Sequence, residues 1–142
     1  MAAGLTPRVF WALVPLVAHS ITGCAKMSPQ GTALIEYRRS GGIAGREDRL
    51  VVLTDGTVRL SRRGAVTDYR ISADTLNELR ALLERVDFRR MREEYLPTRR
   101  GADLFEYEVI YQGRRIRTMD TAVPPELQPL LQLLSGFASR PP

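Results

Sequence analysis

The sequence predicts a single small α+β domain, an antiparallel β-sheet of hairpins arranged as a meander with two α-helices packed on it. Three observations support this prediction. Residues 32–71 and 104–117 alternate between apolar and polar positions, which is the period of β-strands. Residues 76–86 and 127–134 repeat apolar residues at spacings of three and four, which is the period of amphipathic helices. Glycine-containing dipeptides between the strand segments indicate tight turns.

The first residues of the chain have the features of an export signal. Arg8 precedes the apolar run 9–17, which is far shorter than the roughly 20 residues that a helix needs to cross a bilayer. The run leads into Ile21-Thr22-Gly23-Cys24, which resembles the lipobox of bacterial lipoproteins, in which the cysteine is lipidated and becomes the new N-terminus. The alternative is an ordinary cleaved signal peptide with an accidental cysteine.

This resemblance implies a division of the N-terminal part of the chain and a location. We expect residues 1–23 to be removed as a lipoprotein signal peptide and residues 24–32 to form the lipidated Cys24 and a short polar tether. The lipid would hold the protein to a membrane of the cell envelope. Ala25 is not the aspartate that marks many Gram-negative lipoproteins for the inner membrane. The expected location is therefore the periplasmic face of the outer membrane, or the outer face of the cytoplasmic membrane in other bacteria.

Cleavage at Cys24 restricts the chemistry of the mature chain. His19 is the only histidine and Cys24 the only cysteine, so the mature domain has no imidazole and no free thiol. Histidine-activated nucleophiles, zinc sites built on histidine or cysteine and dithiol redox chemistry are therefore excluded. We expect no metal, no cofactor and no enzymatic activity.

The charge distribution gives no indication of nucleic-acid binding. The formal net charge of the chain is +5, but the arginines are spread in pairs with carboxylates between them. A protein that binds a phosphate backbone usually gathers its basic residues in one tract. We therefore expect no nucleic-acid partner.

The first half of the domain predicts strands joined by tight turns. Residues 34–39 and 49–54 are strand segments, and Asp55-Gly56 between apolar runs predicts a two-residue type I′ turn. Such a turn pairs Leu53 with Val58 and Val51 with Leu60, and places these four side chains on one face. Arg62-Arg63-Gly64 predicts the next turn and residues 66–71 a further strand.

Two segments predict helices. Ser72 is a good N-cap, and Leu76, Leu79, Leu83 and Val86 follow at helical spacing, with the apolar contact continuing through Phe88 and Met91 until Tyr95-Leu96-Pro97 stops the element. Pro124-Pro125-Glu126 begins the second helix, because prolines are tolerated where first-turn N–H groups lack partners. Its apolar face is Leu127, Leu130, Leu131 and Leu134.

The segment 104–111 is the clearest strand, and Gln112-Gly113 closes a second two-residue turn. This turn pairs Glu108 with Arg117. Glu106 and Glu108 lie on one face about 7 Å apart, a separation compatible with a catalytic carboxylate pair. A solvated ion pair between Glu108 and Arg117 explains the pattern without catalysis and is favoured.

The glycine-rich segment Ser40-Gly41-Gly42-Ile43-Ala44-Gly45 follows the first strand and carries one large apolar side chain, Ile43. Its glycines allow a sharp reversal or a close approach of another backbone. Ile43 either projects from a binding loop or points into the core from a β-bulge or tight corner. The segment does not predict a phosphate site, because no lysine and no helix start follow the glycines.

Several motifs resemble those of the emfourin family. They are residues 39–45, Asp87-Phe88 after the first helix, Ala102-Asp103 leading into Phe105-Glu106-Tyr107, and Val123-Pro124-Pro125-Glu126-Leu127 before the leucine helix. The resemblance implies an emfourin-like α+β domain at residues 33–138, followed by a tail at 139–142. The lipoprotein signal and the long meander at 51–69 depart from the shortest members of that family.

Emfourins are protein inhibitors of thermolysin-like zinc metallopeptidases, so the resemblance implies such a peptidase as the partner. The peptidase-binding segment would be Ser40, Gly41, Gly42, Ile43, Ala44 and Gly45. Ile43 is the expected anchor, because these peptidases favour a bulky apolar residue just after the scissile bond. Asp103 either closes the loop before the next strand, which is favoured, or makes a second contact. The alternative function is a non-inhibitory envelope lipoprotein that acts as a scaffold or interaction module.

Overall fold

The computed structural model describes residues 31–99, 101 and 103–140, which form one α+β domain. This confirms the predicted fold class. In chain order the elements are β1 (Ala33–Gly41), β2 (Arg46–Leu53), β3 (Thr57–Arg62), β4 (Ala65–Arg70), α1 (Ala73–Arg85), β5 (Glu94–Tyr95), β6 (Phe105–Tyr111), β7 (Arg114–Met119) and α2 (Gln128–Ala138). Cys24 and the proposed signal peptide lie outside the described residues.

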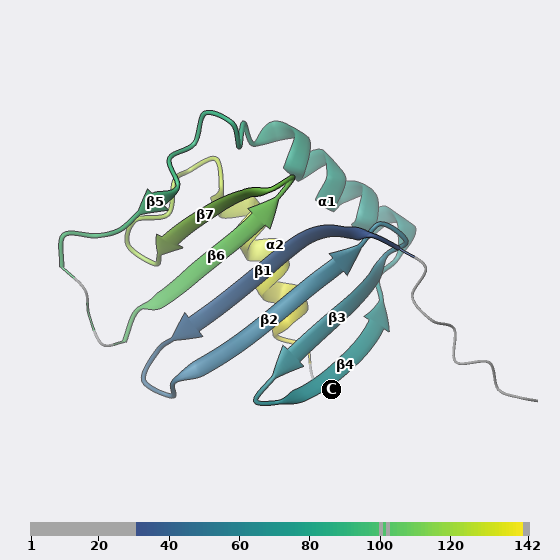
Figure 1. Cartoon of the computed structure of the whole chain (residues 1–142), viewed down its shortest axis with the longest axis horizontal. Coiled ribbons are helices and arrows are strands. Elements are labelled where there is room, and N and C mark those ends of the chain that lie inside the picture. The colour runs from purple at the N-terminus through teal and green to yellow at the C-terminus, as the bar shows by residue number, and fades with distance from the viewer. Residues whose placement is uncertain (1–30, 100, 102, 141–142) are drawn as a thin grey trace, which may run out of the picture.

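The seven strands form one sheet in the order β4-β3-β2-β1-β6-β7-β5 (Figure 1). Neighbouring strands are antiparallel except for the two-residue strand β5, which runs parallel to β7. The sheet differs from a simple meander, because β6 returns to pair with β1 and β5 adds to the far edge. The long strand β1 therefore lies between β2 and β6 in the middle of the sheet.

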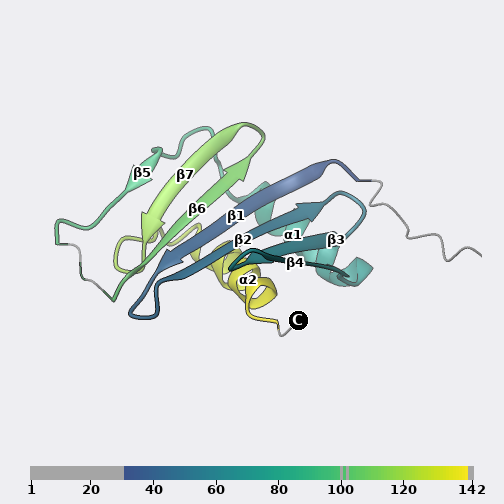
Figure 2. The same cartoon turned by 60° about the horizontal axis from the view of Figure 1, so that its bottom comes forward.

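Both helices lie on the same face of the sheet, which gives the domain two layers (Figures 1 and 2). The core between the layers combines one face of the central strands with the leucine stripes of α1 and α2. Its largest fully buried side chains are Tyr37, Ile35, Leu50, Leu79, Ile116, Leu127, Leu130 and Leu134. Within the described residues, no helix is long and apolar enough to cross a membrane.

The turn after β2 differs from the predicted type I′ turn. Asp55 has no positive φ, and only Gly56 does, at +84°. The observed register pairs Val52 with Val58, so the predicted pairing of Leu53 with Val58 is wrong by one residue. Asp55 stabilises the longer turn, because its carboxylate accepts hydrogen bonds from the backbone N–H of Thr57 at 2.9 Å and from the Thr57 hydroxyl at 3.1 Å.

The other two tight turns follow the prediction. Arg63 and Gly64 have φ of +49° and +83°, and Gln112 and Gly113 have φ of +48° and +77°, as a type I′ turn requires. The predicted pairing of Glu108 with Arg117 across the second of these turns is confirmed. Register across β6 and β7 is therefore fixed by the turn.

The helix α1 begins as predicted and ends earlier than predicted. The Ser72 side chain accepts the N–H of Thr75 and caps the first turn. The helix stops at Arg85, because Val86 adopts an extended conformation, and Phe88 and Met91 reach the core from irregular turns. The spacing from Val86 to Phe88 to Met91 does not continue the helical period. The helix α2 buries Leu130, Leu131 and Leu134 as predicted, but it starts later than predicted. Pro124-Pro125-Glu126 does not begin it; the helix starts at Gln128, with Pro129 in its first turn.

Candidate functional site

The glycine-rich segment is the connection between β1 and β2. Ser40 and Gly41 belong to β1 and pair with Glu47 and Arg46 of β2. Only residues 42–45 form the turn, which the N–H of Gly45 closes with the carbonyl of Gly42 at 3.0 Å. The predicted six-residue segment is thus two strand residues followed by a four-residue turn, which we name the Gly loop (residues 42–45).

The base of the Gly loop is seated against the start of β6. The N–H of Gly42 donates to the carbonyl of Leu104 at 3.2 Å. Gly41 has φ of +105°, and a Cβ at this position would lie 2.5 Å from that same carbonyl oxygen. A Cβ on Gly42 would lie 2.7 Å from the ring of Phe105. Glycine is strongly favoured at both positions, because an L side chain is strained at these positive φ values. At Gly41 it would also collide with the backbone of Leu104.

The tip of the Gly loop projects away from the domain. The Ile43 side chain is 94% exposed, and the structure therefore excludes the alternative in which Ile43 packs into the core. Among the described residues, Ile43 and Val66 are the large hydrophobic side chains that are exposed. A Cβ on Gly45 would meet no heavy atom within 4 Å. The far side of the loop is thus open, whereas its base is tightly packed.

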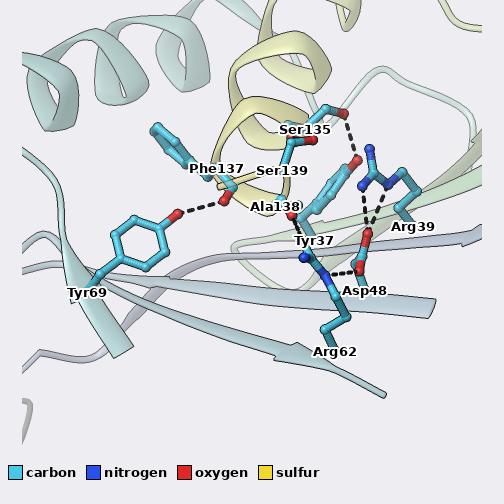
Figure 3. A network of polar contacts seen from close by, with 9 residues as sticks. All are labelled: Tyr37, Arg39, Asp48, Arg62, Tyr69, Ser135, Phe137, Ala138 and Ser139. Carbon is cyan, nitrogen blue, oxygen red and sulfur yellow. Dashed lines mark hydrogen bonds and ion pairs between the residues drawn. The ribbon is translucent and has the colours of Figure 1, made fainter. Parts of the chain in front are cut away.

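A buried ion-pair cluster lies on the strands next to the Gly loop, separated from it by two residue pairs of β1 and β2 (Figure 3). The carboxylate of Asp48 is 1% exposed and accepts hydrogen bonds from Arg39 at 2.6 Å and from Arg62 at 2.9 Å. Arg39 and Asp48 are direct neighbours across β1 and β2, and Asp48 is opposite Arg62 across β2 and β3. The Arg39 guanidinium also lies 5.5 Å from the centre of the Phe105 ring. One carboxylate therefore links the three strands that support the loop.

The same cluster extends to the C-terminal end of α2. Arg62 also donates to the carbonyl of Ala138, and Tyr69 donates to the carbonyl of Phe137 at 2.8 Å. The hydroxyl of Tyr37 is 2.8 Å from that of Ser135 (Figure 3). The bonds from Arg62 and Tyr69 reach carbonyl groups in the last turn of the helix, where the regular helical pairing ends. The loop base and α2 are thus held by one set of polar contacts.

Our sequence reasoning did not single out Arg39, Asp48 or Arg62. Asp48 lies two and four residues before the buried Leu50 and Val52 in β2, on the same face of the strand. Arg39 lies in the same way on the face of β1 that carries Ile35 and Tyr37. Strand alternation alone therefore places both charges on the core face. An aspartate and an arginine at core-facing positions of neighbouring strands are the sequence pattern that could have predicted the cluster.

Asp120 holds the start of β6, next to the loop that contains Asp103. Asp103 is exposed and makes no hydrogen bond to any other described residue. The carboxylate of Asp120 accepts the N–H of Phe105 at 2.8 Å and the hydroxyl of Tyr107 at 2.5 Å. Burial raises the pKa of Tyr107, and the hydrogen bond to Asp120 raises it further. The expectation that Asp103 closes the loop by bonding backbone N–H groups stays a prediction, because residues 100 and 102 of that loop lie outside the described residues.

The two glutamates of β6 are neutralised by arginines. Arg117 forms its ion pair with Glu106, at 2.7 Å, and not with its direct neighbour Glu108 as predicted. The carboxylate of Glu108 instead lies 3.7 Å from the guanidinium groups of Arg38 and Arg115. These contacts account for both carboxylates as parts of a charged surface on the open face of the sheet. No group of three or more potential ligands that could hold a metal occurs within the described part of the chain.

We predict that the Asp48 cluster is more important for stability than any surface ion pair. Asp48→Ala leaves two arginines at the edge of the core without their counter-charge and should lower the free energy of unfolding by about 3–5 kcal/mol. Asp68→Ala is the matched control, because it breaks the exposed pair with Arg59, and it should cost less than about 1 kcal/mol. Urea denaturation measures both, and similar losses would contradict the prediction.

We also predict that the glycines of the segment differ in their roles. Gly41→Asn should lower the free energy of unfolding by roughly 1–3 kcal/mol, because φ of +105° is strained for any side chain and the space is occupied. Gly45→Asn should have a small effect, since φ is +54° there and asparagine adopts this left-handed conformation. Thermal and urea unfolding of the two variants test this, and equal losses would refute it.

The comparisons with known proteins do not assign the chain to a family. No family model matches it, and no curated protein matches it either. The resemblance to emfourins therefore stands on the motifs quoted above.

Proposed function

We propose that this protein is a lipid-anchored inhibitor of thermolysin-like zinc metallopeptidases. The Gly loop, together with Ser40 and Gly41, enters the peptidase cleft, and Ile43 fills the apolar pocket. The observation that carries this proposal is the 94% exposure of Ile43 at the tip of a loop whose base is fixed. The emfourin-like motifs supply the class of target.

The small neighbours of Ile43 support insertion into a narrow cleft. Gly42, Ala44 and Gly45 add little bulk, so the walls of a cleft can approach the loop backbone closely. A single bulky apolar side chain in a pocket, surrounded by contacts that exclude water, is the usual pattern of a binding hot spot. The loop therefore offers one anchor and an accessible backbone on either side of it.

The fixed base of the loop also favours tight binding. Association costs free energy when flexible segments become ordered, and a loop already held in its bound shape loses less entropy. The N–H of Gly42 is bonded to Leu104, and the strands on both sides are tied through Asp48. These contacts hold the base of the loop in place before binding, so less ordering is needed there.

The tether of the proposed anchor joins the domain at the start of β1, and the Gly loop follows the end of that strand. The tether precedes Ala33, whereas the loop follows Gly41, nine strand residues later (Figure 1). At about 3.3 Å per residue the strand separates the two by roughly 25–30 Å. A domain held to a membrane through Cys24 can therefore present the loop on the side away from the lipid.

A second candidate function rests on the edge strand β4. Val66 of β4 is 61% exposed, and β4 is the outer strand of the sheet. An edge strand has a row of free backbone groups that can pair with an extended segment of another protein. In this alternative the protein is a non-inhibitory envelope scaffold that binds its partner along β4.

We predict that Ile43 is required for inhibition and Val66 is not. The assay follows peptide hydrolysis by a panel of thermolysin-like peptidases, thermolysin included, in the presence of the full-length protein in detergent. Ile43→Asp places a charge in the apolar pocket and should weaken inhibition at least about 30-fold, which corresponds to the roughly 2 kcal/mol of a hot-spot residue. Val66→Asp removes the other exposed hydrophobic side chain and should inhibit like the wild type.

The outcomes separate the two candidate functions. Equal inhibition by wild type and Ile43→Asp would keep the function but move the site away from the Gly loop. No inhibition of any panel member would overturn the proposal and leave the β4 scaffold as the candidate. Mass spectrometry of the recovered protein checks that it acts as an inhibitor, since a cleaved loop would show that it is a competing substrate.

We also predict that Cys24 carries the lipid. A fatty-acid analogue fed to bacteria that express the full-length chain should label the wild type and place it in the membrane fraction. Cys24→Ala should lose both the label and the membrane association. Because Cys24 is the only cysteine in the chain, no other thiol can accept the lipid. Labelling of both proteins, or of neither, would contradict the prediction.

A further inference from the structure

A hollow with a basic lining opens beside the Gly loop. It encloses about 250 Å³ between the loop and the turn that joins β3 to β4. Its lining residues are Ala44, Arg46, Glu47, Asp48, Arg62 and Arg63. Ala44 is the direct neighbour of Ile43, so a protein that covers Ile43 also covers this hollow.

Two of the arginines that line the hollow have no carboxylate partner in the described part of the chain. Arg62 is bonded to Asp48, but the side chains of Arg46 and Arg63 make no ion pair or hydrogen bond with any residue that the structure describes. Arg63 lies in the turn between β3 and β4. Apart from Arg46, every arginine of the seven strands lies within 4 Å of a carboxylate, namely Arg38, Arg39, Arg49, Arg59, Arg62, Arg70, Arg114, Arg115 and Arg117. The sheet thus neutralises its cations almost everywhere except beside the loop.

The two carboxylates of the hollow do not cancel this charge. Asp48 is shared between Arg39 and Arg62, so that buried group of three carries a net charge of +1. Glu47 is exposed, and it is the only further carboxylate against Arg46 and Arg63 among the lining residues. The hollow therefore retains an excess of positive charge directly beside the proposed anchor.

We propose that a carboxylate on the rim of the peptidase cleft enters this hollow and accepts hydrogen bonds from Arg46 and Arg63 while Ile43 fills the apolar pocket. This inference rests on the proposed function and specifies the target. Covering two unpaired guanidinium groups with a neutral or basic surface costs free energy, whereas an acidic surface compensates both. The preferred peptidases are accordingly those with acidic residues beside the cleft.

The charge also affects how fast the complex forms. Complementary charges at the edge of an interface raise the association rate at low ionic strength, and salt screens this effect. Inhibition should therefore weaken as salt is raised, and most strongly for panel members with an acidic rim. A purely apolar contact through Ile43 would not show this dependence.

The test is the double variant Arg46→Gln/Arg63→Gln of the full-length protein. Neither arginine has an ion pair to lose, and glutamine adopts a φ close to that of Arg63, as Gln112 does at +48°. The fold should therefore be kept. Arg85→Gln/Arg89→Gln is the matched control, because it removes the same charge from two exposed arginines that also have no ion pair among the described residues and lie outside the hollow.

Inhibition constants and association rates are measured for both double variants and the wild type at about 0.02 M and about 0.5 M salt. At low salt, Arg46→Gln/Arg63→Gln should inhibit acidic-rimmed peptidases about tenfold less well, with a slower association rate and a weaker salt dependence. Arg85→Gln/Arg89→Gln should behave like the wild type.

Three other results would overturn the inference, and they are distinguishable. If Arg46→Gln/Arg63→Gln matches the wild type at both salt concentrations while Ile43→Asp loses inhibition, the hollow has no role but the proposed function stands. If both double variants lose the same amount, net charge alone is responsible. If the wild type inhibits no member of the panel, the proposed function and this inference fail together.

Discussion

The structure depends on one buried carboxylate, that of Asp48. It lies where the apolar core ends and the Gly loop begins, and it links β1, β2 and β3 through Arg39 and Arg62. Arg62 continues the link to the last turn of α2. A buried ion pair often contributes little net stability, because desolvation offsets the attraction. Its contribution here is geometric, since its bonds fix the ends of three strands and one helix relative to one another.

This constraint separates the residues that shape the Gly loop from the residue that it presents. Gly41 and Gly42 are packed against Leu104 and Phe105, and their backbone conformations exclude side chains. Ile43, one residue later, is almost fully exposed. An isolated exposed hydrophobic residue is common on protein surfaces. Ile43 is distinguished by its position at the tip of a held loop with small residues on either side, where it contributes little to the fold.

Local sequence patterns predicted most of the strands, turns and helices. The prediction was wrong where a side-chain hydrogen bond or a segment distant in sequence changed the turn or the strand pairing. Gln112-Gly113 and Asp55-Gly56 carry the same turn pattern, yet only the first forms the two-residue turn. The Asp55 carboxylate bonds Thr57 and stabilises a longer turn, which shifts the register by one residue. The parallel strand β5 could not be predicted, because a segment of two residues has no periodic pattern of its own.

The candidate site shows the same limit. The glycine pattern identified the segment 40–45, but it did not decide whether Ile43 projects from the loop or packs into the core. Contacts distant in sequence decided it: β6 pairs with β1, and the Leu104 carbonyl then accepts the N–H of Gly42. That bond fixes the base of the loop, and the next residue, Ile43, lies at its exposed tip. The basic hollow has the same origin, because Arg46 and Arg63 come together only through the register of β2 and β3. What a partner would meet at this end of the sheet is therefore set by strand pairing as much as by the loop sequence.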